Sequence, residues 1–155
     1  MSSSIELPAV TLRSAVDGDL TDIERLLVES SLPLIGVAES LGTFIVAESN
    51  GQLVGVVGLE ICCEYALLRS TAVASEWRDR GLGRRLVERI IAEAEVRGIR
   101  ALYLLTTTAE RYFPSFGFAN TTRDVVPAPV QQTAEFQSAC PASATVMCLE
   151  LLGTH

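Results

Sequence analysis

The sequence contains no lysine, so its 12 basic side chains are all arginines. A Walker-type phosphate-binding loop needs a lysine to reach the phosphates, and that class of nucleotide site is therefore excluded. The single histidine, His155, leaves too few of the usual ligands for a zinc site. No apolar run approaches the roughly 20 residues that a membrane-spanning helix requires. We therefore expect neither a bound metal nor a membrane to take part in the function.

Positive charge is scarce overall. The 12 basic and 19 acidic side chains give a net charge of -7, with an isoelectric point near 4.7, which disfavours nucleic acid as a partner. A length of 155 residues with 48% apolar content predicts one domain over residues 9–155, preceded by a flexible tail at residues 1–8. The first residues lack a basic stretch followed by an apolar one, so we expect no signal peptide and a cytoplasmic protein.

There are only 4 cysteines, at positions 62, 63, 140 and 148. The adjacent pair Cys62 and Cys63 would point to opposite faces of a strand, which is poor geometry for a shared metal or a disulfide. We expect all four to be reduced thiols that pack as small apolar side chains.

What the chain does have is an unusual stretch, Arg78-Asp79-Arg80-Gly81-Leu82-Gly83. Two glycines spaced by one residue permit a tight turn with uncovered backbone N–H groups, and a helix follows whose positive dipole end faces the same place. Four arginines fall within eight residues there, at positions 78, 80, 84 and 85. The stretch therefore predicts a site for a phosphate-rich ligand. Leu86 occupies the place of the third glycine of a Rossmann fingerprint, which disfavours a dinucleotide.

Periodicity and turn residues predict the order of the secondary structure. We expect a short strand within 9–15, a helix that begins at 17–19 and closes at Pro33, a short helix or loop at 34–41, strands at 43–48, 53–61 and 65–73, a helix at 82–97, a strand at 99–105, a short helix at 109–116, a long loop at 119–143 and a strand at 144–151. Asn50-Gly51 is a strong hairpin signal, and 62–64 is a second turn. Strand 99–105 should run parallel to 65–73 because a whole helix connects them.

The pattern Arg78-x-x-Gly81-x-Gly83, with Ala72-Val73 five residues upstream of the arginine, resembles the acetyl-CoA pyrophosphate loop of the GNAT superfamily of N-acetyltransferases. This resemblance implies an α/β (α+β) fold. Its mixed central sheet has an antiparallel meander followed by parallel, splayed strands, with helices on both faces. It also implies acetyl-CoA as cosubstrate and direct transfer to an amine, without an acyl-enzyme.

The resemblance also implies which residues hold acetyl-CoA. The pantetheine arm would pair with main chain in the strand before the turn, and the pyrophosphate would take backbone amides of the turn. The matching positions are Thr71, Ala72, Val73, Arg78, Asp79, Arg80, Gly81, Leu82, Gly83 and Arg84. A backbone amide near Ala72 or Val73 would hold the thioester oxygen.

Two side chains that relatives use in catalysis are replaced here. Many relatives carry a tyrosine four residues before the glycine of the Gly117-Phe118 pair, and this position is Phe113. Tyr112 is the neighbouring candidate acid, although a helical step of about 100° predicts that it faces elsewhere. Leu67 stands where some relatives have a glutamate, which leaves Glu60 as the candidate base, with Glu64 as a lesser alternative. For an asparagine that relatives place near the pantetheine, only Thr106 or Thr107 could substitute.

Arg69 is the remaining candidate, because it lies in a strand, 66–73, that should be central and buried. A buried arginine needs an anionic or carbonyl partner. Two alternatives are open: an internal ion pair with Glu60 on the neighbouring strand, or a grip on a substrate carboxylate.

Other segments sharpen the resemblance. Leu104-Leu105-Thr106-Thr107 with Phe113-x-x-x-Gly117-Phe118 is similar to the acetyltransferase domain of N-acetylglutamate synthases. Segments 66–70, 103–108 and 139–144 resemble small GNAT proteins encoded among arsenic-resistance genes. The resemblance implies acetylation of the primary amine of a small molecule, an amino acid or a glutamate-like or toxic analogue.

Several alternatives stay open. The protein could be a non-catalytic CoA-binding sensor or partner module, or it could acetylate a protein N-terminus or an aminoglycoside. An arsenite site on Cys62, Cys63 and Cys140 has little support from their spacing. A homodimer is also left open.

Overall fold

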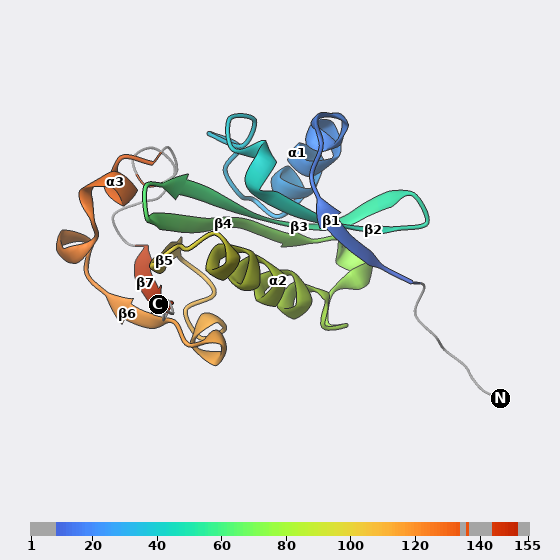
Figure 1. Ribbon diagram of the computed structural model, residues 1–155. Helices are drawn as coiled ribbons and strands as arrows, with labels where there is room; N and C mark the ends of the chain where they lie inside the picture. The colour runs from blue at the N-terminus through green and yellow to red at the C-terminus, as the bar shows by residue number, and fades with distance from the viewer. Residues whose placement is uncertain (1–8, 134–135, 137–143, 152–155) are drawn as a thin grey trace.

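The computed structural model describes residues 9–133, 136 and 144–151. These residues build a seven-stranded sheet with strand order β1-β2-β3-β4-β5-β7-β6 (Figure 1). The strands are β1 (Thr11–Ser14), β2 (Phe44–Ser49), β3 (Gln52–Cys62), β4 (Tyr65–Val73), β5 (Ala101–Thr106), β6 (Ala119–Thr121) and β7 (Thr145–Glu150). The tail predicted at residues 1–8 lies outside the described residues.

The sheet is mixed, as predicted. Strands β2, β3 and β4 form an antiparallel meander, and β4 pairs with β5 in parallel. The β2–β3 turn has Asn50 at φ 53° and Gly51 at φ 78°, the two left-handed residues of a type I′ hairpin. The antiparallel strands β7 and β6 extend the sheet beyond β5.

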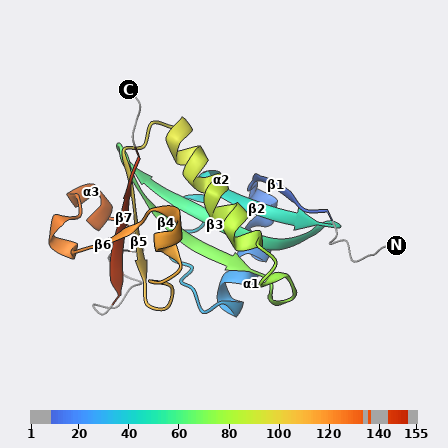
Figure 2. The ribbon, with the colours of Figure 1, turned by 90° about the horizontal axis from the view of Figure 1, so that it is seen from below.

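Helices cover both faces of the sheet, which confirms the expected fold class (Figures 1 and 2). Helix α1 (Leu20–Glu29), preceded by the 3-10 turn η1 (Asp17–Asp19), packs Ile23 and Leu27 against one face. Helix α2 (Leu82–Val96) packs Leu86 and Ile90 against the other. No helix among the described residues is long and apolar enough to cross a membrane.

Helix α2 begins and ends at glycines in the left-handed region. Gly81 precedes it at φ 84° and Gly98 follows it at φ 77°. Near its C-terminal end, Arg97 Nε donates to Glu93 Oε2 over 3.0 Å, an i, i+4 pair in the favourable orientation. The tight turn at Gly81 and the C-terminal glycine therefore fix the length of this helix.

The sheet opens between β4 and β5. Their parallel pairing is limited to Tyr65–Leu67 opposite 101–103, although β5 stays paired with β7 as far as Thr106. In the open part of β4, Ser70 has a φ of 62°, and Ser70 and Thr71 together stand opposite one residue of β3. This bulge locally bends β4, so the splayed arrangement implied by the resemblance is present.

Three local predictions need correction, whereas residues 34–41 form turns, the loop alternative of the prediction, that lead into the 3-10 helix η2 (Leu41–Thr43). Helix α1 ends at Glu29, because Ser31 at φ 59° already turns the chain before Pro33. Cys62 ends β3 whereas Cys63 lies in the following turn at φ 62°, so the pair does not sit on one strand. Segment 109–116 is a turn followed by the 3-10 helix η4 (Phe113–Phe116). The proline at position 114 has no backbone N–H, so it is tolerated in the first turn of a helix but not in the interior of one that begins at residue 109.

The long loop expected at 119–143 contains regular structure: β6, the 3-10 helix η5 (Arg123–Val125) and helix α3 (Ala128–Gln131). These elements are too short for the periodicity of apolar residues to predict them. Val126, Val130 and Phe136 pack against Leu67 and Tyr103 of the sheet in a third core cluster. Residues 134–135 and 137–143 lie outside the described residues.

Candidate functional site

A cavity of roughly 210 Å³ occupies the opening of the sheet. Its walls come from both diverging strands and from the segment after β5. The lining residues include Leu68, Arg69, Ser70 and Thr71 of β4, Leu104, Leu105 and Thr106 of β5, and Thr108, Ala109, Tyr112 and Phe113, with Leu32 from the loop after α1. A narrow, half-apolar space between two strands suits a flexible chain with a few polar groups.

A second, more open hollow of roughly 410 Å³ lies at the N-terminus of α2. It is lined by Val73, Trp77, Arg78, Asp79, Gly81, Gly83, Arg84 and Tyr112. Tyr112 also lines the first cavity, so the two spaces meet at this side chain. Together they extend from the middle of β4 to the start of α2.

The N-terminus of α2 is suited to an anion. Its first turn carries no acidic residue and no side-chain cap, so the amide N–H groups and the positive helix dipole face the hollow without internal compensation. A β-carbon added at Gly83 would lie 3.5 Å from the Tyr112 hydroxyl and 3.7 Å from Val73 Cγ2. Larger side chains at Gly83 would therefore reduce the passage between the hollow and β4. A pyrophosphate fits these donors.

Three arginines lie at the rim of the hollow: Arg78 and Arg84 line it, and Arg80 stands in the chain between the lining residues Asp79 and Gly81. Arg78 Nε donates to the Val73 carbonyl over 3.1 Å, and the guanidinium of Arg80 lies 5.8 Å from the Trp77 ring. Arg84 Nη2 donates to Ser115 Oγ over 2.8 Å, with its guanidinium 4.5 Å from the Phe116 ring. All three arginines are exposed, so they add positive charge near the hollow, which the acidic residue Asp79 also lines.

Arg69 is held from three sides. Its Nη1 lies 3.2 Å from Glu60 Oε1, its Nε donates to Ser70 Oγ over 2.9 Å, and its Nη2 donates to the Pro33 carbonyl over 3.3 Å. The Arg69 side chain is 0% exposed, yet it lines the cavity. The ion pair with Glu60, one of the two predicted alternatives, is therefore present. Glu60 itself does not line the cavity but stands behind the arginine.

The prediction that Tyr112 faces away from the site is wrong. Phe113, at 7% exposure, enters the core beside Phe118, with ring centroids 5.7 Å apart. Tyr112 instead stacks edge-on against Phe116 at 5.3 Å and lines both spaces. The expectation assumed an α-helix, whereas residues 110–112 form a turn that places Tyr112 on the cavity side. Partial burial raises the pKa of the Tyr112 phenol, Arg84 opposes this change and Glu88 adds to it.

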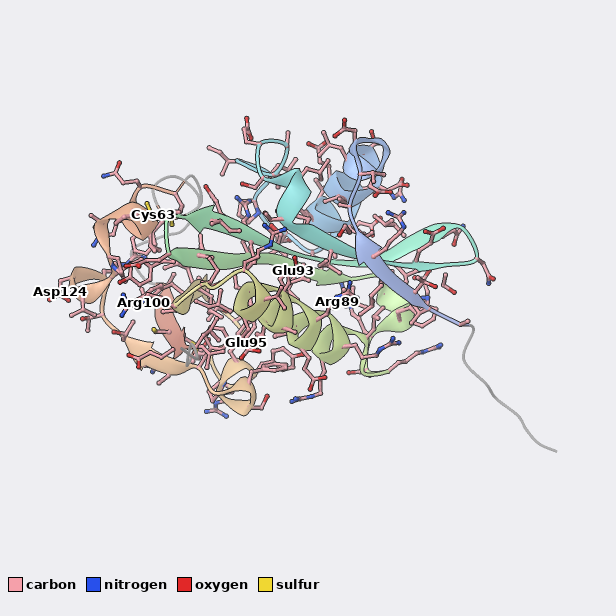
Figure 3. The ribbon with its side chains drawn as sticks, in the orientation of Figure 1. Cys63, Arg89, Glu93, Glu95, Arg100 and Asp124 are labelled. Atoms are coloured by element: carbon pink, nitrogen blue, oxygen red, sulfur yellow. The ribbon has the colours of Figure 1, made fainter. Side chains whose placement is uncertain are left out.

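Thr106 lines the cavity, and its Oγ1 accepts the Ala109 amide over 2.9 Å. Thr107, the other residue considered, is exposed and does not line it. Cys63 lies in the β3–β4 turn, beyond the end of β4 opposite to Val73 (Figure 3). Cys140 lies outside the described residues, so the arsenite hypothesis receives no support from the structure.

Sequence reasoning missed three contributors to the site. The Pro33 carbonyl and the Ser70 hydroxyl hold Arg69, and the Thr71 hydroxyl is buried in the cavity wall without a hydrogen-bond partner. A backbone carbonyl leaves no sequence signal. The polar Ser70-Thr71 pair within an apolar strand could have indicated the site, because burying a hydroxyl in a strand costs free energy unless it finds a hydrogen-bond partner.

An open mixed sheet whose splayed strand leads through a glycine turn into a helix is the arrangement of the GNAT acetyltransferase fold. The family model described as acetyltransferase (GNAT) domain matches residues 40–120, more than half of the chain, and the chain belongs to this family.

Two related proteins are 29% and 32% identical to this chain over the aligned residues. The amino-acid acetyltransferase of Neisseria meningitidis is 32% identical over 130 residues, covering 76% of this chain and 29% of that protein. The uncharacterized N-acetyltransferase CT2212 of Chlorobaculum tepidum is 29% identical over 92 residues, 59% of each chain. The chain thus spans less than two thirds of the length of these curated relatives.

Solved structures share the fold. N-acetylglutamate synthase from Neisseria gonorrhoeae, complexed with coenzyme A and N-acetyl-glutamate, superposes with a TM-score of 0.79 at 24% identity, over 94% of this chain and 36% of that chain. Rv2747 from Mycobacterium tuberculosis, in complex with CoA and NLQ, gives 0.78 at 23% identity, over 92% and 99%.

Proposed function

We propose that this protein is an acetyl-CoA-dependent N-acetyltransferase that acts on the primary amine of an amino acid or an amino-acid-like compound. The observation that carries the proposal is the position of the two spaces: the slot between β4 and β5 and the hollow at the N-terminus of α2 share Tyr112 as a lining residue. A long thioester with a pyrophosphate at one end and a reactive group at the other matches this shape. The family membership and the CoA-bound structural neighbours support the same cosubstrate.

Acetyl-CoA supplies an activated acetyl group, so that amine plus thioester gives amide plus free thiol. The amine nitrogen forms the new C–N bond, the C–S bond breaks, and the proton lost by nitrogen balances the proton gained by sulfur. No oxidant or metal is required. The protein must hold the thioester, orient the amine and manage two protons.

The turn before α2 holds the phosphate end. The amides of residues 79–84 and the helix dipole bind the pyrophosphate, and the rim arginines Arg78, Arg80 and Arg84 add positive charge. The main chain of Thr71, Ala72 and Val73 is our candidate for holding the arm. The Val73 carbonyl already accepts a hydrogen bond from Arg78. The arm would therefore pair with the Val73 amide, or it would have to displace Arg78 from the carbonyl.

Arg69 is our candidate for binding an acceptor carboxylate. Arg69 is one of the residues that line the slot, and two of its three side-chain hydrogen bonds go to neutral oxygens of Pro33 and Ser70. A carboxylate bound in the slot would lie near the positive charge of Arg69, which forms an ion pair with Glu60 on the adjacent strand. The amino-acid acetyltransferases among the relatives point to the same class of acceptor.

The two protons have one candidate each. Tyr112 stands where the two spaces meet, and its raised pKa keeps the phenol protonated at neutral pH, as a donor to the leaving thiolate must be. Glu60, with a side chain 15% exposed, would accept the amine proton through water. An α-amine has a pKa near 7.7–8.0, so it needs only a weak base.

The test is release of free thiol from acetyl-CoA with a panel of acceptors. The panel contains glutamate and glutamine, the corresponding α-amides without the α-carboxylate, an aminoglycoside and an N-terminal peptide. We expect turnover with the free amino acids and at least about tenfold less with the α-amides. Equal rates for acids and amides would contradict the carboxylate role of Arg69. Binding of acetyl-CoA without turnover on any acceptor would instead indicate the sensor or partner module.

A further inference from the structure

Thr71 carries a hydroxyl that the folded chain leaves unused. Its Oγ1 is buried and has no hydrogen-bond partner, and the residue lines the slot between β4 and β5. The neighbouring hydroxyl at the same bulge differs, because Ser70 Oγ accepts from Arg69 Nε over 2.9 Å. Of two consecutive hydroxyls, one therefore serves the fold and one does not.

An unpaired buried hydroxyl costs free energy. Burial without a partner is worth about 1–3 kcal/mol against the folded state, and valine has nearly the same shape without that cost. Such a group in a native structure needs an explanation, and a ligand that pairs with it is one. Because Thr71 is one of the residues that line the slot, a ligand bound there would lie next to this residue.

The position of Thr71 along β4 indicates which ligand atom it meets. Val73, two residues in one direction, lies beside Gly83 at the phosphate end of the site. Arg69, two residues in the other direction, is the residue that we propose binds the carboxylate of the acceptor. Strand residues advance about 3.3 Å each, so Thr71 lies about 7 Å from Val73, and Arg69 lies on the other side of the bulge at Ser70. Thr71 is therefore placed where a thioester arm that enters from α2 would meet the amine.

We propose that the Thr71 hydroxyl donates a hydrogen bond to the carbonyl oxygen of the thioester, in addition to any main-chain amide. As the C–N bond forms and the C–S bond breaks, negative charge develops on this oxygen, and a preorganised donor in a water-poor slot stabilises it. Thr71 would then be a catalytic residue through its side chain as well as a binding position through its main chain. This inference rests on the proposed function.

The central variant is Thr71→Val, which removes the hydroxyl and keeps the branched shape, with Thr71→Ser as the variant that keeps it. For Thr71→Val we expect turnover to fall by about 10²-fold with the KM for the amine unchanged. Thr71→Ser should stay within several-fold of the wild type. Calorimetry on the Thr71→Val variant should give an unchanged Kd for CoA and a Kd for acetyl-CoA raised by about 2- to 10-fold, the value of one neutral hydrogen bond.

Stability gives a readout that does not depend on activity. Without ligand, Thr71→Val should be at least as stable to urea as the wild type, because it deletes an unsatisfied group. Ser49→Ala is the matched control: Ser49 Oγ is also buried without a partner but lines neither space described above. It should match or exceed the wild type in stability and leave turnover unchanged.

The outcomes separate this inference from the proposed function. An active wild type with an equally active Thr71→Val variant overturns the inference alone. A Thr71→Val variant that loses stability without ligand overturns it too, since the hydroxyl would then serve the fold. A change only in the KM for the amine would place the hydroxyl on the acceptor and also overturn it. Absence of CoA binding by the wild type overturns the proposed function itself.

Discussion

The guanidinium of Arg69 is fully buried, and the nearest carboxylate oxygen, Glu60 Oε1, lies 3.2 Å away on the adjacent strand with its side chain 15% exposed. The pair is asymmetric, because water can reach the anion more readily than the cation. Arg69 is also one of the residues that line the cavity. This arrangement can present a positive charge to a ligand without leaving that charge uncompensated in the core.

The asymmetry predicts unequal effects of removing each partner. Glu60→Gln strands a buried cation and should lower the free energy of unfolding by about 3 kcal/mol. Arg69→Met leaves a carboxylate that water can solvate, and should cost at least about 1 kcal/mol less. The double variant should be more stable than Glu60→Gln alone. Urea denaturation of the three variants measures this, and equal losses for both single variants would contradict the asymmetry.

The turn before α2 gives the second prediction. Gly81→Glu puts a negative side chain beside the helix N-terminus, and we expect CoA binding to become undetectable by calorimetry because charge and bulk both oppose the pyrophosphate. Its φ of 84° adds about 1 kcal/mol of backbone strain.

Gly98→Glu is the matched control for this variant. Gly98 has a φ of 77°, a β-carbon there would also meet nothing within 4 Å, and it lies at the other end of the same helix. The control should show a similar loss of stability with CoA affinity unchanged. If both variants bind CoA equally, the phosphate end is not at this turn.

Tyr112 gives the third prediction, which concerns pH. Tyr112→Phe should lower turnover by about 10²-fold because the leaving thiolate loses its proton donor. In the wild type, activity should decline at alkaline pH as the phenol ionises, above its ordinary value of about 10 because burial raises its pKa. The variant should lack this alkaline decline. Tyr65→Phe, which removes a hydroxyl outside both spaces, should keep the wild-type profile.

The fourth prediction concerns stability and pH at the start of the fold. Asp19 accepts from Arg13 Nη1 at 2.8 Å, from Arg13 Nη2 at 3.0 Å and from the Val16 amide at 2.8 Å. These bonds, the one from Arg13 above all, lower the pKa of Asp19. A lowered pKa in the folded state means that the stabilisation is complete above the unfolded value near 3.9 and is lost as pH falls through the folded value.

Asp19→Asn should therefore cost about 2 kcal/mol at pH 7, and the difference from the wild type should shrink progressively below pH 4. Asp22→Asn removes half of the exposed pair with Arg25 and is the control. It should cost no more than about 0.5 kcal/mol at either pH. Urea denaturation at pH 7 and pH 3 compares them. A difference for Asp19→Asn that persists unchanged at pH 3 would contradict the ionic origin.

The sequence by itself determined most of the architecture. Short apolar runs, the Asn50-Gly51 turn and the stripe through Leu86 and Ile90 act locally, so a meander, a covering helix and a parallel strand could be predicted from neighbours in the chain. Gly81 and Gly83 likewise marked the turn where we propose that the pyrophosphate binds, because the left-handed backbone found at Gly81 is one that only glycine adopts easily.

Only the tertiary structure decided how side chains converge in the opening of the sheet. Tyr112 and Gly83 are distant in sequence, and their approach depends on the turn at residues 110–112, which the periodicity of the sequence does not predict. The Pro33 carbonyl meets Arg69 across 36 positions, and the unpaired state of the Thr71 hydroxyl depends on every group around it. Local preferences fix which elements form, but hydrogen bonds and burial at a site depend on contacts between distant segments, and these exist only once the sheet and its two covering layers are packed.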